Sequence, residues 1–307
     1  MKLSIVIPCY NSAKTIRSVV EDISNTFSGK KDWEYELILV NDCSRDATIL
    51  ELRKLANQHN NIIAIDLVKN VGQHSAMMAG FRFATGDIIS TADDDGQTPL
   101  ENIMLLIDKM NEGYDVVCAR YKDRAQPSLT RRLGTKMSRA MSDWLIEKPK
   151  GIILSTFFVA KKFVIDEMIK YNQPYPFVTG LLSRVTQNIA NVDMDQNARR
   201  EGASGYNLKK LLSLWLNGFT AFSIKPLRVS SFAGMIFAGI GFLGVVLTII
   251  RKIVDLNIAV GWSSIVSLLL IIGGLIMCML GMIGEYVGRI YMCINATPQY
   301  VIKEVIK

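Results

Sequence analysis

Two long runs without charged residues limit most strongly what this chain can fold into. Residues 229–250 contain no Asp, Glu, Lys or Arg, and neither do residues 256–284. Each run exceeds the roughly 20 residues that a helix needs to cross the hydrocarbon core of a membrane. A pair of buried core helices is the alternative, but a soluble domain rarely needs helices this long and this apolar. We therefore predict a two-span transmembrane region over residues 229–292.

The distribution of Lys and Arg predicts how these spans are oriented. Basic residues precede the first run and follow the second, and the connecting segment carries fewer. Cytoplasmic segments are the ones enriched in Lys and Arg. We predict a protein of the cell (inner) membrane with its N-terminal domain and both termini in the cytoplasm, an interfacial amphipathic helix at residues 208–228 and a cytoplasmic tail at residues 293–307. The basic residues are Lys209, Lys210, Lys225 and Arg228 before the spans, Arg251 and Lys252 between them, and Arg289, Lys303 and Lys307 after them.

The first part of the chain, residues 1–207, is predicted to be one α/β domain. Short β-branched runs alternate with amphipathic stretches, which predicts a mostly parallel sheet with flanking helices. Ligands bind such sheets at the carboxyl ends of the strands. The expected strands are 3–7, 35–40, 62–66, 87–92 and 115–119, and the expected helices are 13–27, 47–58, 75–84 and 99–111, the last with Thr98 as its N-cap.

A basic amphipathic stretch follows this alternation at residues 126–150, which include Arg131. It is either a solvated face over a core stripe or a helix that lies on an anionic membrane surface. The net charge of +7 would also suit nucleic acid. However, the basic residues cluster beside the predicted spans, so we expect a membrane partner and no nucleic acid.

An acidic turn follows the fourth expected strand. Asp93 and Asp95 are two residues apart, so their carboxylates can converge on one hard cation. Mg²⁺ and Mn²⁺ take oxygen ligands and commonly combine one or two carboxylates with substrate phosphates. Such a cation would neutralise a departing diphosphate. An acidic solvated loop is the alternative. A calcium-binding EF-hand loop is excluded, because Thr98 stands where that loop requires Gly.

Asp42 follows the second expected strand. An acidic residue at the end of a strand in such a sheet can hydrogen-bond a ribose or a base edge. The alternative is that Asp42 caps the helix that follows it.

Four motifs in order resemble those of the family 2 (GT-A fold) glycosyltransferases. They are IVIPCYN at residues 5–11, VNDCSRD at 40–46, NVGQHSA at 70–76 and DDDGQTP at 93–99. GEYVGRIY at residues 284–291 is similar to the end of the second span in the polyprenyl-phosphate glycosyltransferase branch. That branch includes dolichol-phosphate mannosyltransferase-like and undecaprenyl-phosphate aminoarabinose transferase-like enzymes. The resemblance covers nearly the whole chain.

The resemblance implies a metal-dependent, inverting transfer of a sugar from a nucleotide-sugar to undecaprenyl phosphate at the cytoplasmic membrane face. The donor is expected to be UDP-linked and to carry an amino-sugar, and a homo-oligomer is compatible with the sequence. The implied catalytic residues are Asp95, Arg199 and Thr156. The implied nucleotide pocket is Pro8, Tyr10, Asn11, Asp42, Gln73 and Asp93, and the Mg²⁺ or Mn²⁺ ligands are Asp93, Asp95 and Gln97. The implied acceptor-phosphate residues are Arg131, Arg199, Ser204, Tyr206 and Arg289.

His74 lies within the NVGQHSA motif. For this residue, a structural hydrogen bond at the start of a helix is favoured over catalysis.

One departure from the family pattern concerns the base. Many members carry an Asp-Phe-Arg motif whose Asp is taken as the base, whereas this chain has Ser155, Thr156, Phe157 and Phe158. A phosphate monoester has a second pKa of about 6 and is mostly dianionic in the cytoplasm, so it needs little deprotonation before attack. Thr156 could orient it instead. The alternatives left open are a non-catalytic membrane scaffold and, less favoured because no QxxRW element occurs, a processive polysaccharide synthase.

Overall fold

The computed structural model describes residues 1–30, 32–121, 148–197, 261–295 and 297–307, together with scattered positions between 227 and 253. The chain divides into two compact units. Unit 1 comprises Met1–Leu208 and Ala296–Lys307, and unit 2 comprises Lys209–Asn295.

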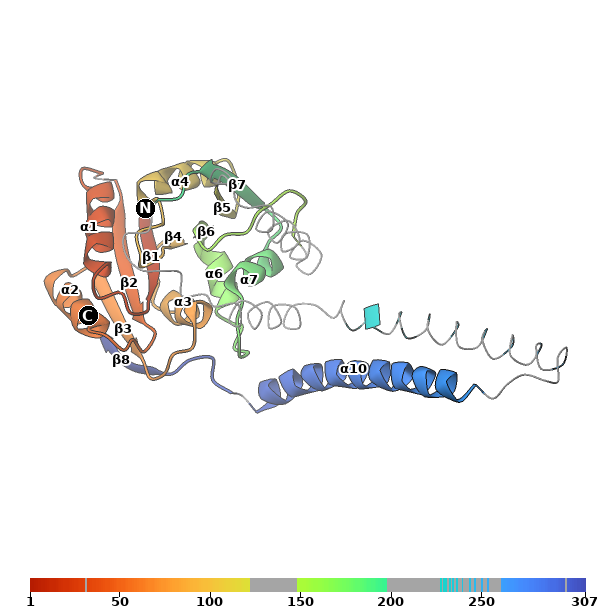
Figure 1. The fold of residues 1–307 in the computed structure, drawn as a ribbon. Coiled ribbons are helices and arrows are strands. Elements are labelled where there is room, and N and C mark those ends of the chain that lie inside the picture. The colour runs from red at the N-terminus through yellow and green to blue at the C-terminus, as the bar shows by residue number, and fades with distance from the viewer. Residues whose placement is uncertain are drawn as a thin grey trace. The chain divides into compact units, whose positions relative to one another are not determined.

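The described part of unit 1 is built on an eight-stranded sheet with the order β7-β5-β6-β4-β1-β2-β3-β8 (Figure 1). The central strands β4, β1, β2 and β3 run parallel to one another, as do β5 and β7, whereas β6 and β8 are antiparallel to their neighbours. The mostly parallel α/β sheet predicted from the sequence is therefore confirmed. The strands are β1 (Lys2–Cys9), β2 (Glu34–Asn41), β3 (Ile62–Leu67), β4 (Ile88–Thr91), β5 (Val116–Tyr121), β6 (Phe158–Lys161), β7 (Ile189–Met194) and β8 (Ile302–Ile306).

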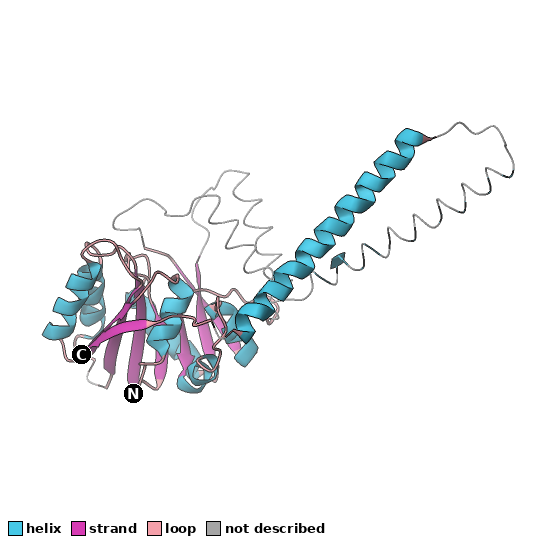
Figure 2. Ribbon diagram, turned by 90° about the horizontal axis from the view of Figure 1, so that it is seen from below, coloured by secondary structure: helices cyan, strands magenta, loops and turns pink. Residues whose placement is uncertain are grey.

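Helices cover both faces of this sheet (Figure 2). On one face, α1, α2 and α4 pack against the strands, and on the other face lie α3, α6 and α7. Burial on both faces explains why the central strands read as continuous apolar runs. The described helices of unit 1 are α1 (Ile16–Phe27), α2 (Thr48–Gln58), α3 (Gln73–Phe81), α4 (Ile103–Asn111), α6 (Lys162–Met168) and α7 (Val178–Val185), with a short 3-10 helix η1 (Leu100–Asn102) before α4.

One cluster of the buried core lies on the face that α1, α2 and α4 cover. Leu3, Ile5 and Ile7 of β1 all point into it and are fully buried. The alternate residue Val6 points to the opposite face, where a Cβ at Gly80 of α3 would lie only 2.4 Å from its Cγ1 atom. Glycine at this position therefore lets α3 pack directly on the sheet, and α3 carries Gln73 at its start.

The start that we predicted for the fourth helix was wrong. Thr98 was expected to cap a helix at residues 99–111, but η1 begins at Leu100 and α4 at Ile103, without a side-chain cap. The Thr98 hydroxyl instead accepts a hydrogen bond from the Asp93 N–H at 2.9 Å. A competing local acceptor thus closes the acidic turn in place of starting a helix.

The last residues of the chain form β8 (Ile302–Ile306), although the sequence suggested a tail. Figure 1 shows β8 beside β3, and their pairing is antiparallel, with Asp66 opposite Glu304. Arg53 of α2 forms an ion pair with Glu304, with Nη1 donating to Oε1 at 3.0 Å. The chain therefore leaves unit 1 after Leu208 and returns to its sheet after residue 296.

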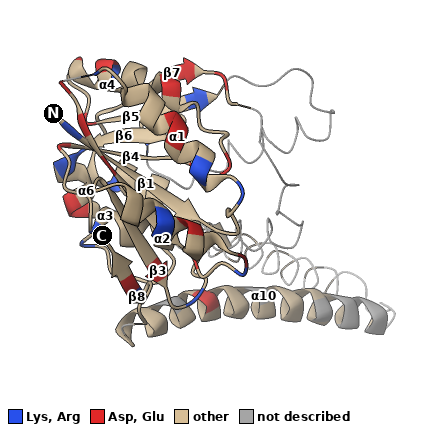
Figure 3. Cartoon of the chain, turned by 90° about the vertical axis from the view of Figure 1, so that its left-hand side faces the viewer, with Lys and Arg blue, Asp and Glu red and all other residues tan. Residues whose placement is uncertain are grey.

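Unit 2 contains α10 (Trp262–Ile294), a helix of 33 residues. Within the described residues, Ile271–Ile294 is the one segment that is long and apolar enough to cross a membrane. Figure 3 shows α10 almost without charged residues, in contrast to the helices of unit 1. Most of the first predicted span lies outside the described residues, although Val229, Phe232 and the other described positions there are helical. The second span of the predicted pair is therefore found as an apolar helix, and the first stays a prediction.

Most of each predicted amphipathic segment lies outside the residues that the structure describes. Residues 122–147, which hold most of the first, and residues 198–226, which hold most of the second, are not among the described residues.

Candidate active site

The carboxyl ends of β1, β2 and β4 meet at one edge of the sheet, and polar loops follow all three. These loops are residues 10–15, 42–47 and 92–98. The segment that contains Thr156 lies against the end of β4, because the Thr91 hydroxyl donates a hydrogen bond to the backbone carbonyl of Thr156. The structure thus brings the predicted residues Tyr10, Asn11, Asp42 and Asp93 and the backbone of Thr156 to the same edge.

Hydrogen bonds hold the acidic turn after β4, residues 93–97, in one conformation. The Gln97 N–H donates to Asp95 Oδ1 at 3.0 Å, and the Gln97 carbonyl accepts from the Asn197 N–H at 3.0 Å. Gly96 has a φ of 77°, a left-handed conformation that glycine adopts without steric cost. The DDDGQ pattern therefore encodes a fixed turn, in which the acidic side chains are held in place.

The three carboxylates of this turn have different environments. Burial, followed by the charges of Asp95 and Asp94, raises the pKa of Asp93 to about 6. Burial also raises the pKa of Asp94, whose Oδ2 accepts the Tyr10 N–H at 2.9 Å. Gln73 Nε2 donates to Asp93 Oδ1 at 3.0 Å. Asp94 therefore ties the turn to the loop after β1, while Asp93 and Asp95 concentrate negative charge.

This concentration of charge fits a divalent cation. A cation would offset both the burial of the Asp93 charge and its repulsion by Asp95 and Asp94, which together raise the Asp93 pKa. Within the described ranges no cluster of three or more His, Cys, Asp or Glu side chains could hold a metal. A cation held by Asp93 and Asp95 would need further oxygen ligands, such as those of a substrate phosphate, which is a common arrangement for Mg²⁺.

The loops after β1 and β2 are fastened to each other. Asn11 has a φ of 55°, and its Oδ1 accepts the Arg45 N–H at 2.9 Å while its own N–H donates to Ser44 Oγ at 3.0 Å. The Ser12 N–H donates to Thr48 Oγ1 at 2.8 Å. Asn tolerates the left-handed region better than most residues. Asn11 thus links the two loops through hydrogen bonds at both its backbone and its side chain.

Asp42, in the loop after β2, is buried and hydrogen-bonds the segment before α3. Its carboxylate accepts the N–H groups of Val71 at 2.7 Å and Gly72 at 2.9 Å. Burial raises its pKa, and these two hydrogen bonds oppose the rise. The helix-cap alternative for Asp42 is wrong, because α2 begins only at Thr48.

A hydrogen-bond chain links the C-terminal strand to these loops, and sequence reasoning missed it. Lys303 Nζ of β8 lies 3.4 Å from Asp66 Oδ2. Asp66 Oδ1 accepts Asn41 Nδ2 at 2.7 Å, and Asn41 Oδ1 accepts the Ser44 N–H at 3.2 Å. Asp66 and Asn41 are both buried. The residues are far apart in the sequence, so no local pattern indicated the link.

The remaining predicted residues are placed as follows. Pro8 is buried in β1 opposite Val40, and Tyr10 is 45% exposed. Arg289 lies in α10 of unit 2. The other acceptor-phosphate residues, Arg131, Arg199, Ser204 and Tyr206, lie outside the described residues.

His74 lies at the start of α3, and its ring packs edge-on against Phe177 with 5.1 Å between centroids. Its Nδ1 is buried and has no hydrogen-bond partner in the described part of the chain. The structural hydrogen bond expected of His74 is therefore not found at this nitrogen. Burial lowers its pKa to about 4, so the ring is neutral at pH 7.

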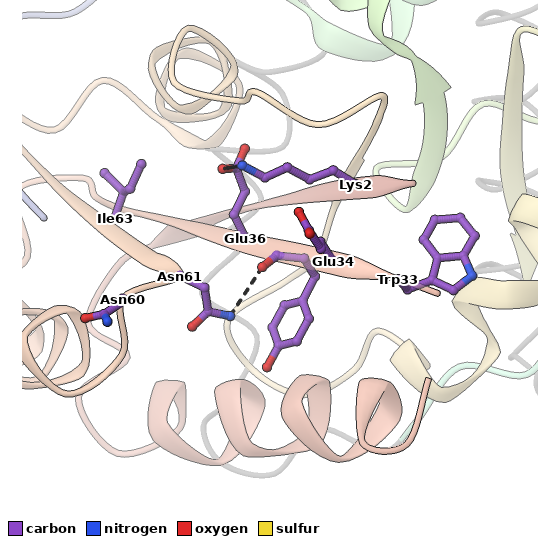
Figure 4. Close-up of a pocket in the computed structure, with 8 residues that line it drawn as sticks. Lys2, Trp33, Glu34, Glu36, Asn60, Asn61 and Ile63 are labelled. Atoms are coloured by element: carbon purple, nitrogen blue, oxygen red, sulfur yellow. Dashed lines mark hydrogen bonds and ion pairs between the residues drawn. The ribbon is translucent and has the colours of Figure 1, made fainter. Parts of the chain in front are cut away.

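A pocket of about 430 Å³ lies at the opposite edge of the sheet, where β1, β2 and β3 begin (Figure 4). Lys2 and Glu36 meet in it, with Lys2 Nζ 2.7 Å from Glu36 Oε2. Trp33 and Asn61 are among its other lining residues. None of the predicted site residues lines this pocket, so it is distinct from the polar edge.

Comparisons with known proteins agree with this geometry. The family description "Glycosyl transferase family 2" matches residues 4–173, and "GtrB C-terminal hairpin" matches residues 225–290. The chain is 34% identical to the undecaprenyl-phosphate 4-deoxy-4-formamido-L-arabinose transferase of Proteus mirabilis, over 99% of this chain and 94% of that one. It is 32% identical to the bactoprenol glucosyl transferase of Shigella phage SfX, over 99% of each chain.

A solved structure shares the fold. Glucosyl-3-phosphoglycerate synthase from Mycobacterium tuberculosis, in complex with Mn²⁺, UDP-glucose and phosphoglyceric acid, has a TM-score of 0.52 to this chain at 21% identity. The match covers 71% of this chain and 77% of that one.

Proposed function

Because this chain belongs to glycosyl transferase family 2, we propose that it transfers a sugar from a nucleotide-sugar to a polyprenyl phosphate. One observation carries the proposal. The similarity to enzymes named for undecaprenyl-phosphate and bactoprenol transfer extends over 99% of the chain and includes the C-terminal hairpin as well as the glycosyltransferase domain. The acceptor is thus inferred from both parts of the molecule.

The polar edge of the sheet would bind the donor. Asp42, Asn11 and Tyr10 would face the nucleoside, and Asp93, Asp95 and Gln97 would hold Mg²⁺ or Mn²⁺ against the diphosphate. The Mn²⁺ and UDP-glucose named with the mycobacterial structure of the same fold support this arrangement. When bound, the cation would stabilise the negative charge that develops on the leaving diphosphate. We propose a UDP-linked donor.

The acceptor phosphate would be the nucleophile. Its oxygen would form a bond to the anomeric carbon while the bond from that carbon to the diphosphate oxygen breaks, which inverts the configuration and releases the nucleoside diphosphate. The phosphate is mostly dianionic near neutral pH, so the absence of a carboxylate at Ser155–Phe158 does not prevent attack. We assign alignment of this phosphate to Thr156 and Arg199, with Arg131, Ser204, Tyr206 and Arg289 contributing.

The path of the chain supports two membrane crossings. The chain leaves unit 1 after Leu208, and β8 rejoins the sheet of unit 1 after α10. A segment that starts from and returns to a domain on one side of a membrane crosses that membrane an even number of times. We propose that α10, which is long and apolar enough, makes one crossing and that residues 229–250 make the other. The resulting layout is a glycosyltransferase domain at 1–207, an interfacial helix at 208–228, a two-span region at 229–292 and C-terminal residues at 293–307.

We expect reporters fused to the two ends of α10 to report opposite sides of the membrane. A fusion after Lys307 should lie on the same side as the glycosyltransferase domain, because β8 belongs to the same sheet as β1. The distribution of Lys and Arg predicts that this side is the cytoplasm. A fusion inserted between residues 255 and 260 should be on the other side. Paired phosphatase and fluorescent-protein reporters would measure this, and two reporters on the same side would contradict the two-span proposal.

The function itself is tested by transfer in vitro. The purified chain would be incubated with undecaprenyl phosphate, Mn²⁺ and each of a panel of UDP-linked sugars and amino-sugars, and the lipid product would be identified by mass spectrometry. We expect one donor to give a sugar-phosphate lipid. Binding of nucleotide-sugar without any transfer to the lipid would favour the non-catalytic scaffold instead.

A further inference from the structure

Tyr121 is the last residue of β5 and had no role in the sequence analysis. It pairs with Met194 of β7 at the carboxyl end of both strands. Its hydroxyl group is buried, yet it has no hydrogen-bond partner among the residues that the structure describes. Almost all buried polar groups in proteins are paired, and an unpaired one costs free energy. Tyr121 therefore carries a donor that none of the described residues accepts.

The position of Tyr121 in the sheet places it at the same edge as the acidic turn. β5 and β4 are both antiparallel to β6, which lies between them, so the carboxyl ends of β5 and β4 lie at one edge of the sheet. The negative charges of Asp93 and Asp95 act on it, and after burial they are the causes that raise the pKa of Tyr121 well above its usual value. A raised pKa keeps the phenol protonated at neutral pH, so Tyr121 can donate a hydrogen bond but cannot serve as a base. Its donor thus lies within the electrostatic reach of the acidic turn.

We propose that the Tyr121 hydroxyl donates a hydrogen bond to a phosphate oxygen of substrate bound at the acidic turn. The inference rests on the proposed function, in which Asp93 and Asp95 hold a cation that carries phosphate oxygens. An uncharged donor suits this place, because it pairs with a phosphate oxygen without competing with the cation for the carboxylates. The phosphate can belong to the donor diphosphate or to the lipid acceptor, and the two are separable by experiment.

The test compares Tyr121→Phe with Tyr300→Phe in the full chain. Tyr300 is a matched control, because its hydroxyl is also buried without a partner in the described part of the chain. Tyr300 lies between α10 and β8, where the Arg82 guanidinium sits 5.8 Å from its ring centroid. Both substitutions remove a buried hydroxyl that has no partner among the described residues, and only Tyr121 lies within reach of the acidic turn.

Stability of the free protein is the first measurement. Removal of a hydroxyl without a partner should leave the melting temperature unchanged or raise it in both variants. A clear loss of stability in Tyr121→Phe alone would show that the hydroxyl has a structural partner, and it would overturn the proposal.

Ligand binding is the second measurement. Calorimetry with UDP and Mn²⁺, without lipid, reports the donor site, and the KM for undecaprenyl phosphate reports the acceptor site. Loss of a hydrogen bond to a charged group should weaken one of them by about 10-fold or more in Tyr121→Phe. Tyr300→Phe should match the wild type in both.

Weaker UDP binding assigns the hydrogen bond to the donor diphosphate, and a raised KM for the lipid with unchanged UDP binding assigns it to the acceptor. If Tyr121→Phe matches the wild type in both, the proposal is wrong. Failure of the proposed function gives a different result, because the wild type would then bind UDP and Mn²⁺ without forming a sugar-lipid. The calorimetric comparison of the two proteins would still decide whether Tyr121 binds the diphosphate.

Discussion

Asp95→Asn is expected to lower turnover by at least about 100-fold while the fold persists. Asn keeps an oxygen that can accept the Gln97 N–H, which Asp95 Oδ1 accepts at 3.0 Å, so the acidic turn should stay closed. The substitution removes the negative charge that would bind the cation, and with it the stabilisation of the leaving diphosphate. Initial rates across a Mn²⁺ titration, together with the melting temperature, measure both parts of the expectation.

A matched control is available on α4. Asp108 is an exposed aspartate of that helix, and Asp108→Asn makes the same chemical change away from the polar edge. It should leave turnover and its dependence on Mn²⁺ unchanged. Full activity of Asp95→Asn, or of the wild type in excess chelator, would refute the assignment of the cation to this turn.

Deletion of residues 302–307 is expected to destabilise unit 1 by on the order of a few kcal/mol, because several backbone hydrogen bonds to β3 are lost together. The Arg53–Glu304 and Lys303–Asp66 ion pairs are lost as well. The uncovered edge of β3 should also promote aggregation. Chemical denaturation of the purified chain and its light scattering on heating measure the two effects.

The control for this deletion is removal of Lys307 alone, the residue that follows β8. It should leave stability unchanged. If the longer deletion also left stability and solubility unchanged, β8 would not be part of the sheet in the intact protein, and the argument for an even number of membrane crossings would fail with it.

The hydrogen-bond chain from β8 gives the C-terminal strand a second consequence. Asp66 receives Lys303 on one oxygen and Asn41 on the other, and Asn41 in turn holds the Ser44 N–H. Ser44 Oγ accepts the N–H of Asn11, a residue proposed to face the nucleoside. The strand β8, which follows α10, is thus connected through polar contacts to the loops after β1 and β2, which we propose bind the nucleotide.

The sequence by itself determined the features that depend on local spacing. The strand and helix alternation of the first 120 residues, the apolar run of α10 and the DDDGQ turn are each encoded within a short window, and the structure shows all three. Local periodicity dictates which residues can share a face, so such elements are readable without the fold. The family resemblance rests on the same local motifs, and the comparisons bear it out.

Features that join distant residues were decided by the tertiary structure. β8 pairs with β3 across most of the chain, and Arg53 and Glu304 are 251 residues apart. Asp42 binds the amides of Val71 and Gly72 and does not cap α2, and Thr98 closes a turn where it was expected to start a helix. The burial of the Tyr121 hydroxyl without a partner among the described residues likewise depends on the fold. Each outcome is a competition among partners that folding brings together, and sequence spacing does not reveal which partner will be near.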